Sequence, residues 1–199
     1  MFKRMSVLVR REGDTREQFL QGWLRHGRFI ADLPGLRGYV QNHVVEEFAM
    51  PGAPFLRADG FVELQFDNPE AMALAFTSPA ARAMADDEPN FLGHGSGYAL
   101  RADTGLGDAE AGDKLIVALG EGDGAARIDA LGLPGLIRDD VAELIAKPGM
   151  APPQPVSSFC HIFGVDPAGA RQTADAIARV VADAPLPLAI FRVKTVRFA

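Results

Sequence analysis

The sequence predicts an α+β fold made of two similar halves, because three features occur twice in the same order. The tetrapeptide Leu-Pro-Gly-Leu stands at 33–36 and again at 133–136. A lysine-led apolar segment that ends in Glu-Gly precedes each copy, at 3–13 and 114–122. A Phe-led segment that runs into Asp and Pro follows each copy, at 61–69 and 159–167. Units that keep their order and spacing indicate a duplicated supersecondary structure.

The first half is expected to begin with a strand and a helix. Residues 4–10 alternate between polar and apolar side chains, which is the period of a half-buried strand. Asp14 or Thr15 offers an N-cap for a helix over 16–31. Spacings of four, three and four residues place one set of side chains on a single face of that helix: Phe19, Trp23, His26 and Ile30.

The remaining elements follow a regular order. After Pro34-Gly35 we expect strands over 36–48 and 58–67, a helix over 69–86 broken or kinked at Pro79, and a strand over 98–101. Residues 102–112, rich in Gly, Asp and Ala, are the expected linker. The second half has expected helices over 124–131 and 168–183 and a last strand over 188–198. Residues 1–101 and 113–199 each then form a ferredoxin-like βαββαβ unit, with both helices on one face of a four-stranded antiparallel sheet.

Strand polarity predicts how the two sheets meet. Val40 and Val44 share one face of their strand, whereas Tyr39, Gln41 and His43 share the other. In the next strand Val62, Leu64 and Phe66 oppose Asp59, Phe61, Glu63 and Gln65. We expect the apolar faces under the helices and the mixed faces toward solvent or a barrel interior. The aromatic residues on the mixed faces favour the interior, so the sheets should pack face to face as an α/β barrel within one chain.

Composition excludes several function classes. The 199 residues carry a net charge of -6, which argues against a nucleic-acid partner. No apolar run approaches the roughly twenty residues of a membrane span, so no membrane partner is expected. The N-terminus enters a strand directly, which predicts a cytoplasmic protein. Cys160 is the single cysteine and is expected to be buried and inert. No metal-ligand spacing or nucleotide fingerprint occurs, so we expect neither a metal nor a cofactor.

Three stretches resemble the EthD-type proteins of the dimeric α/β-barrel superfamily. They are RREGDTREQFLQGWLRHGRFIADLPGLRGYVQNHV at 10–44, DGFVELQFDNPEAMALAFTSP at 59–79 and DDEPNFL at 86–92. The resemblance covers residues 2 to 101, whereas the second half is a degenerate copy without an equivalent of Trp23 or His26. It implies a tandem barrel in one chain. It also implies kinship with small cofactor-free decarboxylases, lactone isomerases and polyketide cyclases, and with monooxygenases, acting on aromatic or lactone substrates.

His26 is the first candidate catalytic residue. Its position at the edge of the apolar helix face points the imidazole toward the sheet, where burial and a hydrogen-bond partner can move its pKa across neutrality. The EthD resemblance implies a histidine at this place. The alternative is a histidine that only caps the C-terminus of the helix.

Other candidates come from the strands. Tyr39 and His43, four residues apart, point to one strand face about 13 Å apart, so a small aromatic substrate could lie between them. Asn42 is expected to face the helices and approach His26. Asp59 and Glu63 share a face and could meet Arg4 and Arg10, either as a charge network in the barrel or as an acid/base pair. Trp23 is a further candidate for substrate binding, and Phe91 is expected over the cavity mouth.

Two functions remain open. The chain is either an enzyme in which His26 moves a proton on a small aromatic, polyketide-like or lactone molecule, or a non-catalytic ligand-binding or stress-associated barrel. Decarboxylation, isomerisation and cyclisation all need such a proton donor and acceptor, and the sequence does not separate them. A closed barrel can still pair with a second copy through its helices or edges, so a homodimer is also an expectation.

Overall fold

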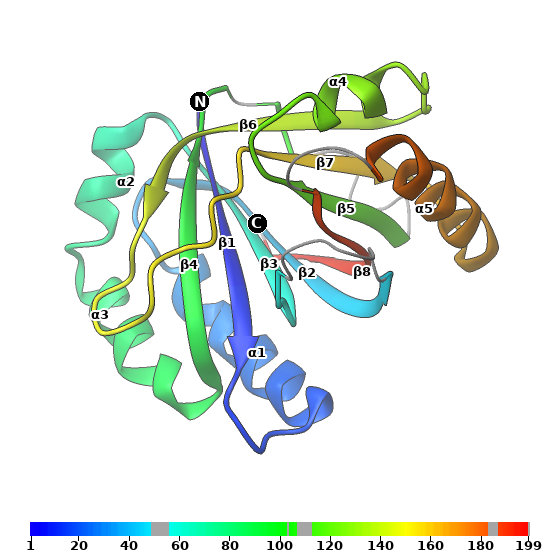
Figure 1. Ribbon diagram of the computed structural model, residues 1–199. Coiled ribbons are helices and arrows are strands. Elements are labelled where there is room, and N and C mark those ends of the chain that lie inside the picture. The colour runs from blue at the N-terminus through cyan, green and yellow to red at the C-terminus, as the bar shows by residue number, and fades with distance from the viewer. Residues whose placement is uncertain (49–55, 103, 107–112, 183–186, 199) are drawn as a thin grey trace.

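The chain forms one closed barrel of antiparallel strands with helices on its outside (Figure 1). The computed structural model describes residues 1–48, 56–102, 104–106, 113–182 and 187–198. The strands are β1 (Phe2–Arg10), β2 (Leu36–Phe48), β3 (Gly60–Phe66), β4 (Leu92–Leu100), β5 (Asp113–Leu119), β6 (Leu136–Ile145), β7 (Ser158–Phe163) and β8 (Pro187–Arg197). The helices are α1 (Arg16–Ala31), α2 (Pro69–Ala75), α3 (Pro79–Asp87), α4 (Gly124–Asp129) and α5 (Pro167–Val181).

The strand order is the same in the two halves of the barrel. It runs β4-β1-β3-β2 in the first half and then, in the same direction around the barrel, β8-β5-β7-β6 in the second. The halves join through hydrogen-bonded ladders between β2 and β8 and between β4 and β6. The predicted α+β barrel within one chain is therefore present, and its two sheets are continuous at both seams. Closure leaves no free sheet edge that could pair with another chain.

Local sequence signals explain the helices. Thr15 caps α1 through a capping box, in which its hydroxyl accepts from the Gln18 amide while the Gln18 side chain accepts from the Thr15 amide. Pro79 separates α2 from α3, as predicted, with Ser78 as the new N-cap. Strand β4 begins at Leu92 and is longer than the predicted 98–101. Residues 103 and 107–112 of the expected linker lie outside the described residues.

The core has three layers. Inside the barrel, the rings of Phe61, Phe159 and Phe191 come together from both halves, with Phe61 at 6.3 Å and 5.2 Å from the other two. A second apolar cluster fills the space between α1, α3 and the first sheet, and a third lies between α5 and the second sheet. No helix in the described ranges is long and apolar enough to cross a membrane.

The predicted faces are correct for β3 and wrong for β2. Val62, Leu64 and Phe66 belong to the cluster under the helices, and Phe61 lies in the barrel. In β2, however, Tyr39 lies under α1 and Val44 faces the barrel. Both faces of β2 are buried from Gly38 to Val44, because the barrel interior covers one and α1 the other. The alternation of polar and apolar residues in β2 therefore could not show which of its faces lies toward the helices.

Candidate functional site

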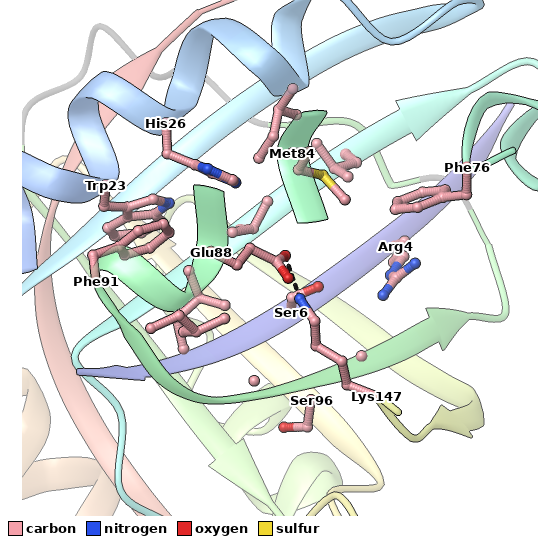
Figure 2. Close-up of a pocket in the computed structure, with 17 residues that line it drawn as sticks. Arg4, Ser6, Trp23, His26, Phe76, Met84, Glu88, Phe91, Ser96 and Lys147 are labelled. Carbon is pink, nitrogen blue, oxygen red and sulfur yellow. Dashed lines mark ion pairs between the residues drawn. The ribbon is translucent and has the colours of Figure 1, made fainter. Parts of the chain in front are cut away.

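A cavity lies between the helices and the outer face of the first sheet (Figure 2). The cavity itself measures about 70 Å³, within a wider empty space of about 550 Å³ that is partly open to solvent. The residues that line it include Arg4, Ser6, Trp23, His26, Phe76, Met84, Glu88, Phe91, Ser96 and Lys147. Of the residues singled out from the sequence for catalysis or binding, the cavity brings together His26, Trp23 and Phe91.

His26 has a carboxylate partner in this cavity. Its Nδ1 lies 2.9 Å from Oδ2 of Asp87 at the end of α3, and the His26 side chain is buried. Despite partial burial, which acts the other way, the hydrogen bond from His26 holds the pKa of Asp87 below its ordinary value. An ionised Asp87 accepts the Nδ1 hydrogen and leaves the Nε2 lone pair of His26 free. This is the orientation that a carboxylate imposes on a histidine acting as a base.

Burial lowers the pKa of His26, and the nearby charges of Asp87 and Glu88 only partly oppose this effect. The imidazole is therefore neutral at pH 7, as a general base must be. The ring packs against Phe91 at 4.8 Å and Phe29 at 6.0 Å. His26 thus lies in an apolar wall with one polar contact, and its side chain points toward the cavity in Figure 2.

The second half of the chain completes the cavity wall. The segment after β6 runs beside α3 in Figure 1 and brings Lys147 into an ion pair with Glu88. On the same segment, Met150 accepts a hydrogen bond from the backbone amide of Gly95 through its sulfur, at 3.0 Å. The ion pair lies between His26 and Arg4 in the view of Figure 2. The site therefore belongs to both halves, which no local sequence signal indicates.

Glycines in the sheet and in α1 make room for the large side chains of the cavity. A Cβ atom on Gly60 would overlap the Trp23 indole, and a Cβ on Gly22 would lie 2.6 Å from Cβ of Phe91. A Cβ on Gly97 would lie 2.7 Å from Nη2 of Arg4. The positions of Trp23, Phe91 and Arg4 therefore depend on the absence of a side chain opposite them.

Tyr39 and His43 lie outside the cavity wall, in a buried hydrogen-bond chain. The Gln41 amide donates to the Trp23 carbonyl at 2.9 Å and to the Tyr39 hydroxyl at 2.5 Å. Its oxygen lies 2.8 Å from Nε2 of His43, whose ring packs on Trp23 at 4.8 Å. Gln41 lies between Tyr39 and His43, where the sequence predicted a substrate, and connects them by hydrogen bonds. These hydrogen bonds attach β2 to α1.

Asn42 and Glu63 lie inside the barrel, in a second polar cluster. The prediction that Asn42 approaches His26 is wrong, because its amide donates to Glu63 at 2.8 Å on the opposite side of the sheet. Glu63 also pairs with Lys3 at 2.9 Å and Lys114 at 2.5 Å, and Lys3 pairs with Asp139 at 2.7 Å. All four charged side chains are at most 1% exposed. Glu63 therefore belongs to a charge network in the barrel, with lysines as its partners in place of the expected Arg4.

Lysine charge determines the protonation of this cluster. Despite full burial, which acts the other way, Lys114 and Lys3 hold the pKa of Glu63 well below its ordinary value. His161 joins the cluster, with Nε2 3.1 Å from Asp139, and burial lowers its pKa. Lys3 and Lys114 are the first residues of the two repeated segments. Each contacts a carboxylate of the other half of the barrel, Lys3 that of Asp139 and Lys114 that of Glu63. The sequence repeat therefore marked these two lysines, although it did not show their contact.

A metal ion fits this cluster poorly. Ligand atoms of Glu63, Asp139 and His161 lie within 4.8 Å of one another, a geometry that long-range contacts create and local spacing does not reveal. However, the ammonium groups of Lys3 and Lys114 already contact both carboxylates, so a divalent cation there would lie beside two positive charges. The residues present form a charge-balanced network in place of a metal cage.

The remaining candidate, Asp59, lies at the far end of the first sheet. It accepts from the Arg10 backbone amide at 3.0 Å and pairs with the Arg10 guanidinium, as the sequence suggested for Arg10. Arg16 approaches it at 3.9 Å. Asp59 therefore connects β1 to the start of β3 and does not line the cavity. A second, open hollow borders β6, and its lining includes Arg101, Glu121 and Arg138 and none of the predicted site residues.

Comparisons with known proteins agree with this fold. The family described as EthD domain matches residues 11–95. An anthrone oxidase-like protein is 10% identical with a TM-score of 0.54, over 98% of this chain and 92% of that chain. A "putative chlorite dismutase" is 13% identical with a TM-score of 0.54, over 98% and 95% of the two chains. A "putative monooxygenase" from Lactobacillus acidophilus NCFM is 12% identical with a TM-score of 0.50, over 98% and 93%. No curated protein matches the chain. At these identities the likeness shows the fold alone.

Proposed function

We propose, from the EthD domain that residues 11–95 form, that this chain is a small enzyme that needs no cofactor and moves a proton on an aromatic, polyketide-like or lactone substrate. The observation that carries the proposal is the His26–Asp87 pair at 2.9 Å in the wall of the cavity. We further propose that 1–101 and 113–199 are two ferredoxin-like repeats, of which the second serves as a scaffold and supplies Lys147.

The chemistry follows from the orientation of His26. Its Nε2 takes a proton from an acidic carbon of the bound molecule, and the electron pair of that C–H bond moves onto an adjacent carbonyl oxygen as an enolate. Asp87 stabilises the imidazolium that forms. Return of the proton to a different carbon completes an isomerisation. Attack of the enolate on a second carbonyl gives the cyclase outcome. In a decarboxylation the electron pair of the C–CO₂ bond moves onto the carbonyl oxygen as carbon dioxide leaves, and the imidazolium form of His26 then donates a proton to the enolate carbon.

His26→Asn and Asp87→Asn test this proposal. We expect His26→Asn to lower turnover of a panel of aromatic acids, butenolides and 1,3-diketones by about 10²–10⁴-fold, and Asp87→Asn to shift the pH profile. The melting temperature should stay close to that of the wild type. A loss of about 0.5–2 kcal/mol of stability, with turnover unchanged, would show that His26 only caps the helix.

One observation favours the alternative, a non-catalytic ligand-binding or stress-associated barrel. The Glu88–Lys147 ion pair lies across the cavity and limits the space beside His26. In that case ligands bind equally well to the wild type and His26→Asn, and no member of the panel is turned over. The homodimer expected from the sequence is likewise a proposal, and light scattering during gel filtration measures it.

A further inference from the structure

We infer that the cavity beside His26 binds a one-ring molecule with a carboxylate or similar oxyanion, held by Arg4, and with a second oxygen that accepts a hydrogen bond from Trp23. The inference rests on the proposed function only for the chemistry that follows binding. It gives the substrate a stated charge and orientation.

Arg4 is a cation of the cavity wall that forms no ion pair with the described residues. It lies on β1 between β3 and β4, and the described residues place no carboxylate within 4 Å of its guanidinium. Its Nε is buried and has no hydrogen-bond partner. The guanidinium lies over the Phe76 ring at 4.8 Å, and Glu88, whose charge acts on it, is already paired with Lys147. Buried donors are normally paired, so this one indicates an absent acceptor.

The burial of Arg4 also favours an anion-binding role for its guanidinium. It lowers the pKa of Arg4 to about 10, which still leaves the guanidinium charged at neutral pH. A desolvated, charged guanidinium with a planar fork is the group that proteins use to bind carboxylates in a bidentate way. An entering anion would therefore gain a contact that the free protein does not satisfy.

Trp23 provides a second donor without a well-aligned acceptor in the same wall. Its side chain is fully buried, and the Tyr39 hydroxyl, the protein group that interacts with its indole, already accepts a hydrogen bond from Gln41. The other buried atoms in the described ranges without a well-aligned hydrogen bond belong to Glu63 and His161 inside the barrel, where Lys3 and Asp139 lie at ion-pair distance from them. Thus the two such donors outside the barrel, on Arg4 and Trp23, line one cavity, and His26 lies in that wall too. Oxygen atoms of a ligand are the acceptors that would satisfy both.

The second half does not copy this arrangement. Lys114 corresponds to Lys3 in the repeated segments, so Leu115 stands where the first half has Arg4. Leu115 is fully buried in the apolar cluster under α5. The anion-binding group therefore occurs in the half that also carries His26, which associates the two residues with one site.

Fluorescence tests the inference, because Trp23 is the only tryptophan of the chain and lines the cavity. Benzoate and its neutral analogue benzamide are titrated against the wild type, Arg4→Met, Arg4→Lys and the exposed control Arg82→Met. We expect Arg4→Met to weaken benzoate binding by about 10- to 100-fold, as loss of a charge-assisted contact does, while Arg4→Lys retains most of it. Benzamide should bind weakly and equally to all four proteins.

Two results would overturn the inference. One is equal affinity of Arg4→Met and the wild type for benzoate in a protein that melts normally. The other is no response of the wild type to benzoate or phenylpyruvate up to about 10 mM, well above the millimolar affinities of weak ligands. Loss of benzoate binding in Arg4→Met together with unchanged turnover in His26→Asn would support the anion site and reject the proposed enzyme. Turnover that depends on His26 but not on Arg4 would do the reverse.

Discussion

Replacing Glu63 by Gln should destabilise the barrel strongly while barely changing its shape. The cluster inside the barrel holds two ammonium groups, of Lys3 and Lys114, against two carboxylates, of Glu63 and Asp139. Each of these side chains is at most 1% exposed. Glu63→Gln keeps the volume and the contact with Asn42 but leaves one buried positive charge without a partner. Breaking a buried ion pair in this way costs about 3–5 kcal/mol, a large part of the typical 5–15 kcal/mol of total stability.

Urea unfolding at neutral pH measures this loss, with the exposed Glu12→Gln as the matched control. The double variant Glu63→Gln, Lys114→Met restores the balance between Lys3 and Asp139, so it should recover a clear part of the lost stability. A Glu63→Gln protein within about 1 kcal/mol of the wild type would refute the reasoning. So would a double variant that is less stable than the single one, because charge balance would then not be the cause.

Three further predictions concern His43, Gly60 and His26 in the first half, the last through Lys147 of the second half. Burial lowers the pKa of His43 in the folded protein to about 4, from an ordinary 6.5. As the pH falls, His43 is therefore protonated in the unfolded protein before it is protonated in the folded one. Stability should be complete above pH 6.5 and fall by up to roughly 3 kcal/mol as the pH drops toward 4, and urea unfolding of His43→Gln should show a smaller slope over that window. Gly60→Ala should push against the Trp23 indole, shift its emission and cost about 1–3 kcal/mol; unchanged fluorescence would contradict the packing. Lys147→Met removes a charge that lowers the pKa of His26 and frees Glu88, which raises it, so an NMR titration of the imidazole should show a higher pKa.

The sequence was sufficient for the parts of the fold that depend on local chemistry. The capping box of Thr15 and the break at Pro79 are local features, and the helix bounds 16–31 agree with α1. The repeated segments predicted two halves with the same strand order, because duplicated patterns fold alike. The face of β2 could not be predicted, since a closed barrel buries both sides of the strand and removes the polar alternation.

The candidate site could be predicted only in part. His26 followed from helix periodicity and the EthD resemblance, and Trp23 and Phe91 from the same motifs. Asp87 was visible only as part of an acidic helix end, and Lys147 lies in the other half of the chain. The sequence also indicated Arg4 indirectly. Arg4 and Ser6 form a polar face on β1, and in the structure this face lies toward the helices, where both side chains line the cavity.

Exchange of solvent deuterium into phenylpyruvate tests the central claim most directly. This one-ring carbon acid carries the carboxylate for Arg4 and the keto oxygen for Trp23, and its benzylic protons are acidic enough for His26 to remove. In D₂O, NMR should show that the wild type accelerates loss of the benzylic proton signal over buffer, and that His26→Asn abolishes the acceleration without weakening binding. Exchange at the buffer rate in the wild type, or equal rates in both proteins, would contradict a proton-transferring His26.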